Sequence, residues 1–415
     1  MKLILGNGKT AQSVAQFLKS KNILFTLLED TRNIKNKNIL QDVDEVFISP
    51  GIPQTQDIIV WALEQDISIT SDIELFSRYA QAPIVGITGS NGKSTVTQLL
   101  GEMIAKDGKK VAIGGNIGTP ALDCLGDKVD YYVLELSSYQ LDYTKNLKLY
   151  AGVVLNITPD HLDRYPSFEH YVKSKLSLYQ HCQHPIINLD ESLVPSMKGA
   201  KYFGMDIPKN DKSFGTVTCH GSCYLLKEDN SLMDVDDIKV IGKHNIANTL
   251  AVLALGDEIG LNMDTMITTI KTFKGLEHRL EWVTKKHNID YYNDSKATNA
   301  IATITALSAL SDKYENIVLI AGGIQKQEDY SALFELVDDK VTGVILIGQS
   351  AKAFGNHIHN TTTHYADSMQ SAVNTASTLI DKGAILLSPA CASFDLFDDF
   401  EHRGRVFKKC VNQIV

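Results

Sequence analysis

One stretch constrains the fold of this chain most strongly: residues 86–95 read Gly-Ile-Thr-Gly-Ser-Asn-Gly-Lys-Ser-Thr. The apolar run 83–87 leads into it, and from Lys93 onward apolar residues recur at helical spacing as far as Gly108. A buried strand, a tight turn and a helix are therefore predicted in that order. Glycines let the backbone amides of such a turn point inward, and the helix start adds the positive end of its dipole. The pattern is typical of a loop that holds nucleotide phosphates.

The residues that end this loop add charge and a metal-binding hydroxyl. Lys93 can follow the phosphates, and Ser94 or Thr95 lies where a hydroxyl would contact Mg²⁺. The strict pattern has glycine at position 87, where this chain has Ile87, so the loop is a variant. The sequence predicts ATP or GTP binding through Gly89, Ser90, Asn91, Gly92, Lys93, Ser94 and Thr95.

Length and charge narrow the class of protein. The 415 residues suggest two to three domains at roughly 150 residues each. A formal net charge of −9 without a long basic run disfavours nucleic acid as the main partner. No apolar stretch approaches the ~18 residues that a membrane span needs, and residues 1–8 read as a strand and turn rather than a signal peptide.

Cysteine usage indicates a reduced protein. The six cysteines are scattered and make no disulfide framework. Cys219 and Cys223 are close in sequence, but no second pair completes a zinc pattern, so a solvated hairpin is favoured there. We expect a cytoplasmic monomer that binds small molecules, without membrane insertion.

Strand and helix patterns alternate along the chain in three blocks. We expect an α/β protein with a Rossmann-like N-terminal domain (1–82), a central domain (83–275) and a Rossmann-like C-terminal domain (276–415). The central domain should resemble P-loop ATPases and have a mostly parallel sheet. Glycine-rich or small polar loops follow the predicted strands, as at ligand sites beyond the carboxyl ends of parallel strands. The strands are predicted at 2–5, 23–28, 45–48, 83–87, 131–136, 151–155, 317–321, 344–347 and 384–387.

The first turn has two readings. Gly6, Gly8 and Ala11, with Asp30 at the end of the next strand, resemble a dinucleotide fingerprint. The same turn could instead hold a nucleotide-sugar diphosphate, and beside a phosphate loop this second reading is favoured. Two phosphate-bearing substrates are then expected.

Two further candidates lie at the ends of central strands. Glu135 interrupts a run that a parallel strand should keep apolar, and burying a carboxylate there is costly unless a cation pairs with it. Magnesium held by phosphate oxygens would be that cation; a structural ion pair is the alternative. His161 follows the strand 151–155 in the same block, which raises it above an ordinary structural histidine.

Eight runs in chain order resemble consecutive motifs of the Mur ligase family. They are Gly-Ser-Asn-Gly-Lys-Ser-Thr (89–95), Gly-Asn-Ile-Gly-Thr-Pro-Ala-Leu (115–122), Leu-Glu-Leu-Ser-Ser-Tyr-Gln-Leu (134–141), Asp-His-Leu-Asp-Arg-Tyr (160–165), Gly-Lys-His-Asn-Ile-Ala-Asn (242–248), His-Arg-Leu-Glu (278–281), Asn-Asp-Ser-Lys-Ala-Thr-Asn (293–299) and Ser-Pro-Ala-Cys-Ala-Ser-Phe-Asp (388–395). The last two are similar to the motifs of members that add D-glutamate. The resemblance spans essentially the whole chain.

The resemblance implies an ATP-driven ligase of peptidoglycan precursor synthesis. The alanyl carboxylate of UDP-N-acetylmuramoyl-L-alanine would attack the γ-phosphate of ATP and become an acyl phosphate. The amine of D-glutamate would then attack this carbonyl through a tetrahedral intermediate and expel phosphate. Positioning and charge neutralisation, with two Mg²⁺ ions, carry such a transfer, and no protein nucleophile is required.

The resemblance also assigns site residues. The catalytic residues would be Lys93, Glu135, His161 and Lys175. The metal ligands would be Ser94, Thr95, Glu135, His161 and Lys175, the last as a carbamate; Lys173 is the alternative to Lys175. Asn245, Asn248, Arg279 and Asp294 would join the loop in binding ATP. The UDP precursor would contact Lys9, Thr10, Thr31, Arg32, Ser49, Asn116, Ser137, Gln140 and His161, and D-glutamate would contact Lys296, Thr298, Lys326, Ser393, Phe394 and Phe400.

The chain departs from the family pattern at Lys9, at Glu277 and at Ile324-Gln325, which affects details of substrate contact. Three rival functions are weaker. A related ligase for another amino acid or a folate acceptor conflicts with the uridine pocket and with the missing Asp-Asn-Pro-Arg motif. A nucleotide-binding switch would not need Glu135, His161 and Lys175 together, and a dehydrogenase would leave the phosphate loop idle.

Overall fold

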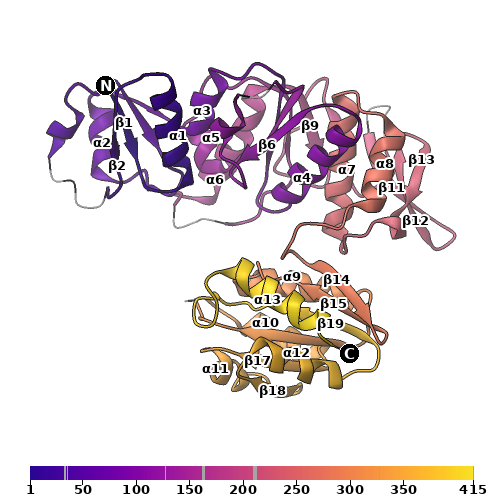
Figure 1. The fold of residues 1–415 in the computed structure, drawn as a ribbon. Coiled ribbons are helices and arrows are strands. Elements are labelled where there is room, and N and C mark those ends of the chain that lie inside the picture. The colour runs from indigo at the N-terminus through magenta and orange to yellow at the C-terminus, as the bar shows by residue number, and fades with distance from the viewer. Residues whose placement is uncertain are drawn as a thin grey trace. The chain divides into compact units, whose positions relative to one another are not determined.

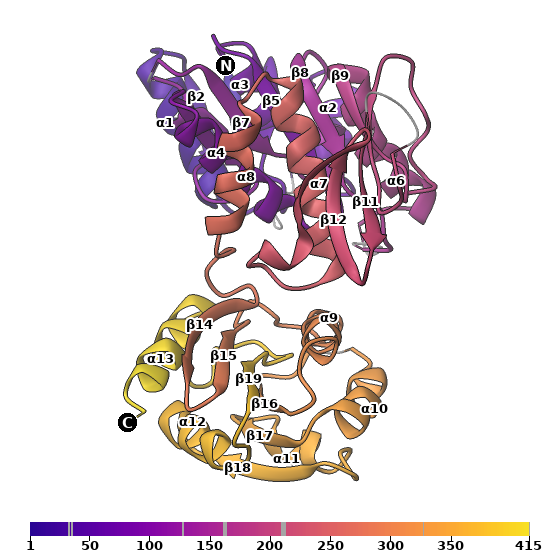
Figure 2. The same cartoon turned by 90° about the vertical axis from the view of Figure 1, so that its right-hand side faces the viewer.

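The computed structural model describes residues 1–31, 34, 36–126, 128–160, 164–208, 213–326 and 328–414. These residues form two compact units, Met1–Asp237 with Ile246–Thr272 and Ile238–Asn245 with Phe273–Val415. The first unit contains two sheets and the second contains one (Figures 1 and 2). The α/β class with three largely parallel sheets is confirmed. The domain boundaries 1–82, 83–275 and 276–415 stay a prediction.

The first sheet is parallel, with strand order β2-β1-β3-β4. Its two inner strands, β1 and β3, are almost wholly buried, which explains their apolar sequences. The predicted strands 2–5 and 45–48 are confirmed, and the one predicted from 23 begins two residues later. The elements are β1 (Lys2–Leu5), α1 (Lys9–Ser20), β2 (Phe25–Leu28), η1 (Lys37–Leu40), β3 (Glu45–Ile48), α2 (Asp57–Glu64), β4 (Ser68–Thr70) and α3 (Asp72–Ser77).

The second sheet has nine strands in the order β13-β12-β11-β10-β9-β8-β5-β7-β6. Neighbouring strands are parallel from β6 to β11, and β12 and β13 add an antiparallel edge. The strands are β5 (Ile84–Thr88), β6 (Val111–Gly115), β7 (Tyr131–Glu135), β8 (Leu149–Val154), β9 (Cys182–Asn188), β10 (Lys201–Phe203), β11 (Ser213–Cys219), β12 (Ser222–Lys227) and β13 (Asn230–Asp234). The helices are α4 (Lys93–Lys106), η2 (Ala121–Cys124), α5 (Ser138–Asp142), α6 (Phe168–Leu176), η3 (Ser177–His181), η4 (Val235–Asp237), α7 (Lys243–Glu258) and α8 (Met263–Thr272).

The predicted hairpin around Cys219 and Cys223 is confirmed. Cys219 ends β11 opposite Ser222, and Cys223 in β12 faces Thr218. All six cysteines are free thiols. Among the described helices, none combines the length and apolar composition that crossing a membrane requires.

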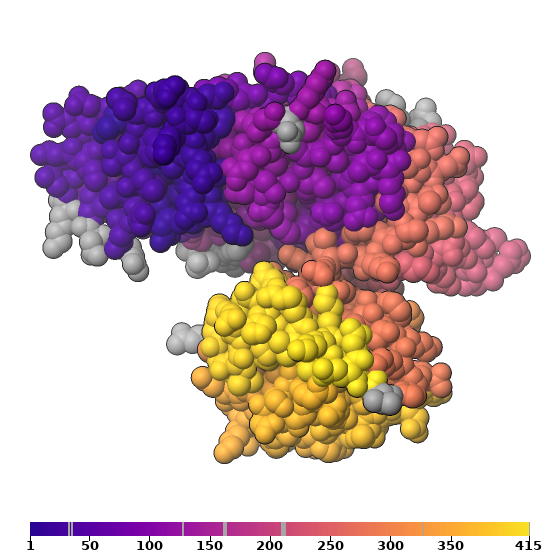
Figure 3. All heavy atoms as spheres, viewed as in Figure 1, coloured from indigo at the N-terminus to yellow at the C-terminus, as the bar shows by residue number. Residues whose placement is uncertain are grey.

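The sheet of the second unit has the order β14-β15-β19-β16-β17-β18, and only β14 runs antiparallel to its neighbour. Its predicted strands 317–321, 344–347 and 384–387 are confirmed to within one residue. Helices cover both faces, and the C-terminal segment forms much of the face of this unit seen in Figure 3. The elements are β14 (Glu281–Lys286), β15 (Ile289–Asn293), α9 (Ala300–Ser311), β16 (Ile317–Gly322), α10 (Ser331–Lys340), β17 (Gly343–Ile347), α11 (Ala351–Gly355), β18 (Thr362–Ala366), α12 (Met369–Thr378), β19 (Gly383–Leu387) and α13 (Phe400–Asn412).

Candidate active site

Parallel pairing brings the predicted catalytic segments of the first unit to one sheet edge. β5 pairs with β7 on one side and β8 on the other, so the residues after these strands lie side by side. The loop 89–92 follows β5, Glu135 ends β7, and Asn156 follows β8. The Ser90 amide donates to the Asn156 carbonyl at 2.9 Å, which joins the loop after β5 to the loop after β8.

Glycine is required in the phosphate loop for both backbone and space. Gly92 caps α4 with φ +82°, in the left-handed region. A Cβ atom at this position would lie 2.4 Å from Asn248 Oδ1. Asn248, predicted to contact nucleotide, therefore packs directly against the loop. Asn156 braces the other side, since its side chain accepts from the Asn91 amide at 2.8 Å and donates to the Asn91 carbonyl at 3.1 Å.

Two lysines converge on this loop. The ammonium groups of Lys93 and Lys175 each donate to the Gly89 carbonyl at 2.8 Å, and Lys93 also donates to the Ser90 carbonyl at 2.9 Å. Lys175 is only 2% exposed. Burial, together with the charge of Lys93, lowers the pKa of Lys175 to about 7. Lys173, the alternative, is exposed on α6.

Glu135 is buried at the end of β7 and held by neutral donors. Ser94 Oγ donates to one carboxylate oxygen and Asn116 Nδ2 to the other, both at 2.7 Å. Carboxylate and hydroxyl oxygens beside a phosphate loop are a donor set that suits Mg²⁺ together with phosphate oxygens. Within the described part of the chain, no three His, Cys, Asp or Glu side chains gather closely enough to hold a metal ion. The predicted ligand His161 lies outside the described residues.

Three of the predicted precursor residues lie at the Gly6 turn: Ser49 packs against Gly6, and Lys9 and Thr10 begin the helix that follows the turn. Gly6 has φ +114°, and a Cβ there would lie 2.5 Å from Ser49 Oγ. Ser49 Oγ is buried and has no hydrogen-bond partner among the described residues. Lys9 is exposed and Thr10 is partly exposed at the start of α1, and Thr31 is partly exposed. The predicted diphosphate partner Arg32 falls in the part of the chain that is not described.

Ser137 and Gln140 form a reciprocal cap at the start of α5. Gln140 is 2% exposed, and its amide nitrogen donates to both carboxylate oxygens of Asp72 at 3.0 and 3.2 Å. Burial raises the pKa of Asp72 to about 6. The Gln140 amide thus joins the end of β7 to the start of α3, a tie that sequence patterns do not signal.

The remaining predicted ATP contacts, Asn245, Arg279 and Asp294, belong to the second unit. Asp294 accepts hydrogen bonds from the Leu280 amide at 3.0 Å and from Ser388 Oγ at 2.8 Å. Burial raises the pKa of this carboxyl group to about 7. Asn245 is buried and donates to the Ile241 carbonyl at 2.7 Å.

The predicted D-glutamate residues also lie in the second unit. Phe400 begins α13, and the others lie on loops that follow β15, β16 and β19. Lys326 Nζ lies 3.4 Å from Thr298 Oγ1, and Lys296 Nζ lies 3.9 Å from the centre of the Phe400 ring. Ser393 is buried, whereas Phe394 is 71% exposed.

Ile324 and Glu277, two positions at which the chain departs from the family pattern, make specific contacts in the second unit. Ile324 exchanges two backbone hydrogen bonds with Ala392, at 2.9 and 3.0 Å, so it fastens the Lys326 loop to the Ser393 loop. Glu277 forms an ion pair with Lys408 at 2.8 Å.

Sequence reasoning missed Arg403, which is 1% exposed in α13. Its guanidinium donates to Ser295 Oγ at 2.9 Å, to the Ser295 carbonyl at 2.8 Å and to the Cys391 carbonyl at 3.1 Å. Arg403 therefore ties together two of the loops that carry predicted D-glutamate residues, the one after β15 and the one after β19. Gly404 beside it was a usable signal: a Cβ there would lie 2.2 Å from His278 Nδ1.

Two family matches place the chain in a class. Residues 87–256 match the Mur ligase middle domain, and residues 278–391 match the Mur ligase glutamate ligase domain. The chain belongs to the Mur ligase family. It is 39% identical, over 99% of its length and 97% of the relative's, to the UDP-N-acetylmuramoylalanine–D-glutamate ligase of Pseudomonas savastanoi pv. phaseolicola. The enzyme of the same name from Nitrosococcus oceani is 37% identical over 100% of this chain and 96% of its own.

A solved structure shows the same fold at low sequence identity. The UDP-N-acetylmuramate-alanine ligase MurC from Thermotoga maritima superposes with a TM-score of 0.62, at 16% identity and with 99% of each chain covered.

Proposed function

We propose that this chain is an ATP-dependent ligase that joins D-glutamate to UDP-N-acetylmuramoyl-L-alanine in peptidoglycan precursor synthesis. The observation that carries the proposal is the buried Glu135–Ser94 pair, 2.7 Å apart, beside the phosphate loop. This arrangement occurs in a chain of the Mur ligase family whose full-length relatives carry the name UDP-N-acetylmuramoylalanine–D-glutamate ligase. ATP and nucleotide-linked precursors are cytoplasmic substrates, so we place the reaction in the cytoplasm, carried out by a monomer.

The reaction requires an activated carboxylate, because an oxide ion is a poor leaving group. Attack of the alanyl carboxylate oxygen on the γ-phosphorus releases ADP and leaves an acyl phosphate. The neutral amine of D-glutamate then adds to the acyl carbon. The tetrahedral intermediate loses one proton from nitrogen to solvent and expels inorganic phosphate, which leaves the amide bond. Both steps depend on alignment and on stabilising phosphate charge.

Residues of the first unit supply the charge stabilisation. The loop amides and Lys93 would hold the β- and γ-phosphates, and Asn248 would limit how far the loop can move. Ser94, Thr95 and Glu135 would hold Mg²⁺, with His161 and a carbamylated Lys175 serving a second ion. When bound, Mg²⁺ would neutralise charge that develops on the phosphate oxygens.

Substrate contacts are assigned by position. The uridine diphosphate end of the precursor would be held by Lys9, Thr10, Thr31, Arg32 and Ser49. Asn116, Ser137, Gln140 and His161 would line the path to the phosphate loop. In the second unit, ATP would be contacted by Asn245, Arg279 and Asp294. D-Glutamate would be bound by Lys296, Thr298, Lys326, Ser393, Phe394 and Phe400. We propose that residues 1–82 bind the uridine end of the precursor and that residues 83–275 bind most of ATP and the rest of the precursor. Residues 276–415 would bind D-glutamate and supply the ATP contacts Arg279 and Asp294.

The test is an assay with ATP, Mg²⁺, UDP-N-acetylmuramoyl-L-alanine and a panel of amino acids. ADP release and product mass are measured for each. We expect ADP and a product heavier by one glutamyl residue with D-glutamate, and little of either with L-glutamate, L-alanine or diaminopimelate. Equal ADP release without any amino acid, or a product with a different amino acid alone, would refute the assignment.

A further inference from the structure

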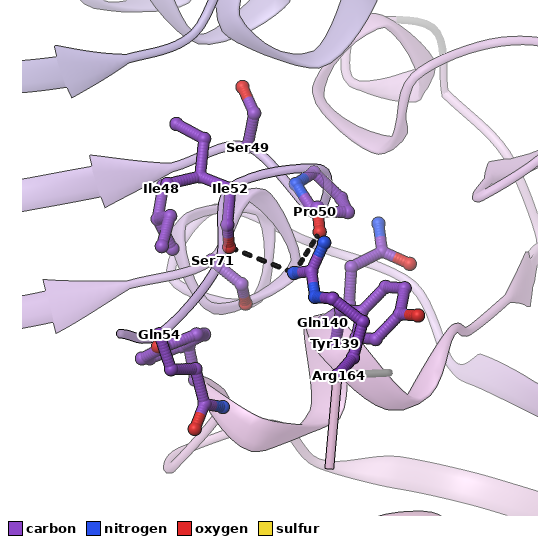
Figure 4. Close-up of a pocket in the computed structure, with 10 residues that line it drawn as sticks. Ile48, Ser49, Pro50, Ile52, Gln54, Ser71, Tyr139, Gln140 and Arg164 are labelled. Carbon is purple, nitrogen blue, oxygen red and sulfur yellow. Dashed lines mark hydrogen bonds between the residues drawn. The ribbon is translucent and has the colours of Figure 1, made fainter. Parts of the chain in front are cut away.

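Arg164 holds one loop of the first sheet onto the central sheet. Its guanidinium donates to the carbonyl oxygens of Pro50 at 2.9 Å and Ile52 at 2.8 Å (Figure 4). It also donates to the Gly51 carbonyl at 2.9 Å. These carbonyls follow β3, whereas Arg164 follows β8, more than 110 residues further along the chain. Three successive carbonyl dipoles that point to one place repel each other, so the planar cation between them stabilises this loop shape.

The loop that Arg164 holds begins with Ser49. The Ser49 amide donates to the Leu5 carbonyl at 3.1 Å, and the Ile52 amide donates to the Ser49 carbonyl at 3.0 Å. The loop is thus anchored at its start by the first sheet and at its end by Arg164. Since Ser49 Oγ is buried without a partner among the described residues, a small movement of the loop would displace this hydroxyl from the Gly6 turn.

A row of aromatic rings continues from Arg164 to the phosphate loop. The guanidinium carbon lies 4.4 Å from the centre of the Tyr139 ring, and this ring stacks on Tyr165 with a centroid distance of 5.9 Å. Tyr165 meets the edge of Tyr171 at 5.4 Å, and the Tyr171 hydroxyl lies 2.9 Å from Ser90 Oγ. The Pro50–Ile52 loop and the phosphate loop are therefore fixed to the same row of side chains.

We infer that Arg164 is a positioning residue that sets the UDP precursor in register with the phosphate loop. The inference rests on the proposed function. A precursor held by Ser49 and its neighbours must reach the γ-phosphate with its carboxylate, and a displacement of about 1 Å can lower the rate of such a transfer by about 10²-fold. Arg164 does not need to touch the substrate: it fixes the distance between the two loops.

Arg78 provides a matched control, because it contacts the other end of β3. It forms an ion pair with Glu45 at the start of β3, at 2.6 and 3.2 Å, whereas Arg164 acts at the end of β3. Both arginines fasten β3 to other elements of the first unit, but only Arg164 holds the Ser49 loop. Loss of either should lower the melting temperature, and only loss of Arg164 should affect the precursor.

The experiment compares wild type with Arg164→Met, Arg164→Lys and Arg78→Met. Binding of UDP-N-acetylmuramoyl-L-alanine is measured by calorimetry without ATP, and KM for all three substrates is measured by ADP release. For Arg164→Met we expect precursor Kd and KM to rise by about tenfold or more and kcat to fall by up to about 10²-fold. KM for ATP and for D-glutamate should stay within about twofold of wild type. Arg164→Lys should be intermediate, because an ammonium group cannot match the planar fork.

Three results would overturn the inference. One is an Arg164→Met protein that melts cooperatively and binds the precursor as wild type does. The second is an equal rise in the KM of all three substrates, and the third is the same precursor effect in Arg78→Met; either of these would indicate general loosening of the unit. Failure of the proposed function looks different, because the wild-type protein itself would then form no D-glutamyl product.

Discussion

Lys175 donates a 2.8 Å hydrogen bond from its ammonium group to the carbonyl oxygen of Gly89, the first residue of the phosphate loop. Lys93 shares the same acceptor. Two cations at one carbonyl repel each other, and the buried one, Lys175, has its pKa lowered to about 7. A large fraction of Lys175 is therefore neutral near pH 7, and only a neutral amine can add carbon dioxide.

Replacing Lys175 tests whether it becomes a carbamate. Lys175→Ala should lower kcat by about 10²-fold or more, because a charge-stabilising group beside the phosphates is lost. Short carboxylic acids such as acetate should restore part of the activity by supplying the missing oxygens. Lys173→Ala, an exposed lysine on the same helix, should behave as wild type. Full activity in Lys175→Ala, or equal losses in both variants, would remove the carbamate hypothesis.

Gly92→Ala should abolish nucleotide binding while leaving the fold intact. The new methyl group would meet Asn248 Oδ1 at 2.4 Å, so the loop or the start of α7 must move. Gly108→Ala at the other end of α4 is the matched control, because Gly108 has φ +79° but open space around its Cβ. Both variants pay the left-handed strain of about 1–2 kcal/mol. Titration with a fluorescent ATP analogue should show loss of binding only for Gly92→Ala; equal affinities would contradict this account.

Elements whose residues are consecutive in the sequence could be predicted from it. The β5–loop–α4 unit was found because strand, glycine turn and helix are consecutive in sequence, and Glu135 stood out as the acid in an apolar strand. At the far edge of the second sheet only the β11–β12 hairpin was predicted. β10 was missed because it has three residues, and β13 because its five residues alternate weakly. Arg164 and Arg403 were missed because most of their acceptors are backbone carbonyls, at Pro50–Ile52 for Arg164 and at Ser295 and Cys391 for Arg403. No residue type marks a backbone acceptor.

Asp294 should make the second unit less stable as the pH rises. Its pKa is about 7 in the folded state against an ordinary 3.8, so between these values the unfolded chain releases a proton that the folded protein keeps. The resulting loss of unfolding free energy is zero below about pH 4, grows as the pH rises to about 7, and stays constant above pH 7.

Asp294→Asn should remove this slope. An amide can still accept from the Leu280 amide and can donate to Ser388 Oγ, so the hydrogen bonds are retained. Thermal melts from pH 4 to 8 should show the variant more stable at pH 8 by about 2–4 °C or more. Asp290→Asn, a change at a partly exposed position of β15, the strand that precedes Asp294, is the control. Parallel profiles for wild type and Asp294→Asn would show that Asp294 ionises normally.

Arg403 should strengthen D-glutamate binding without touching the substrate. Arg403→Met leaves two buried carbonyls and Ser295 Oγ without their donor, which should lower the free energy of unfolding by about 3 kcal/mol or more. Because the loops at 294–298 and 391–394 then lose their common tie, KM for D-glutamate should rise by about tenfold or more, whereas KM for the UDP precursor should not change. Arg405→Met, exposed on the same helix, should match wild type in both measurements. If Arg403→Met instead raises the KM of both substrates equally, its role is general stability of the fold and not the shape of the amino-acid site.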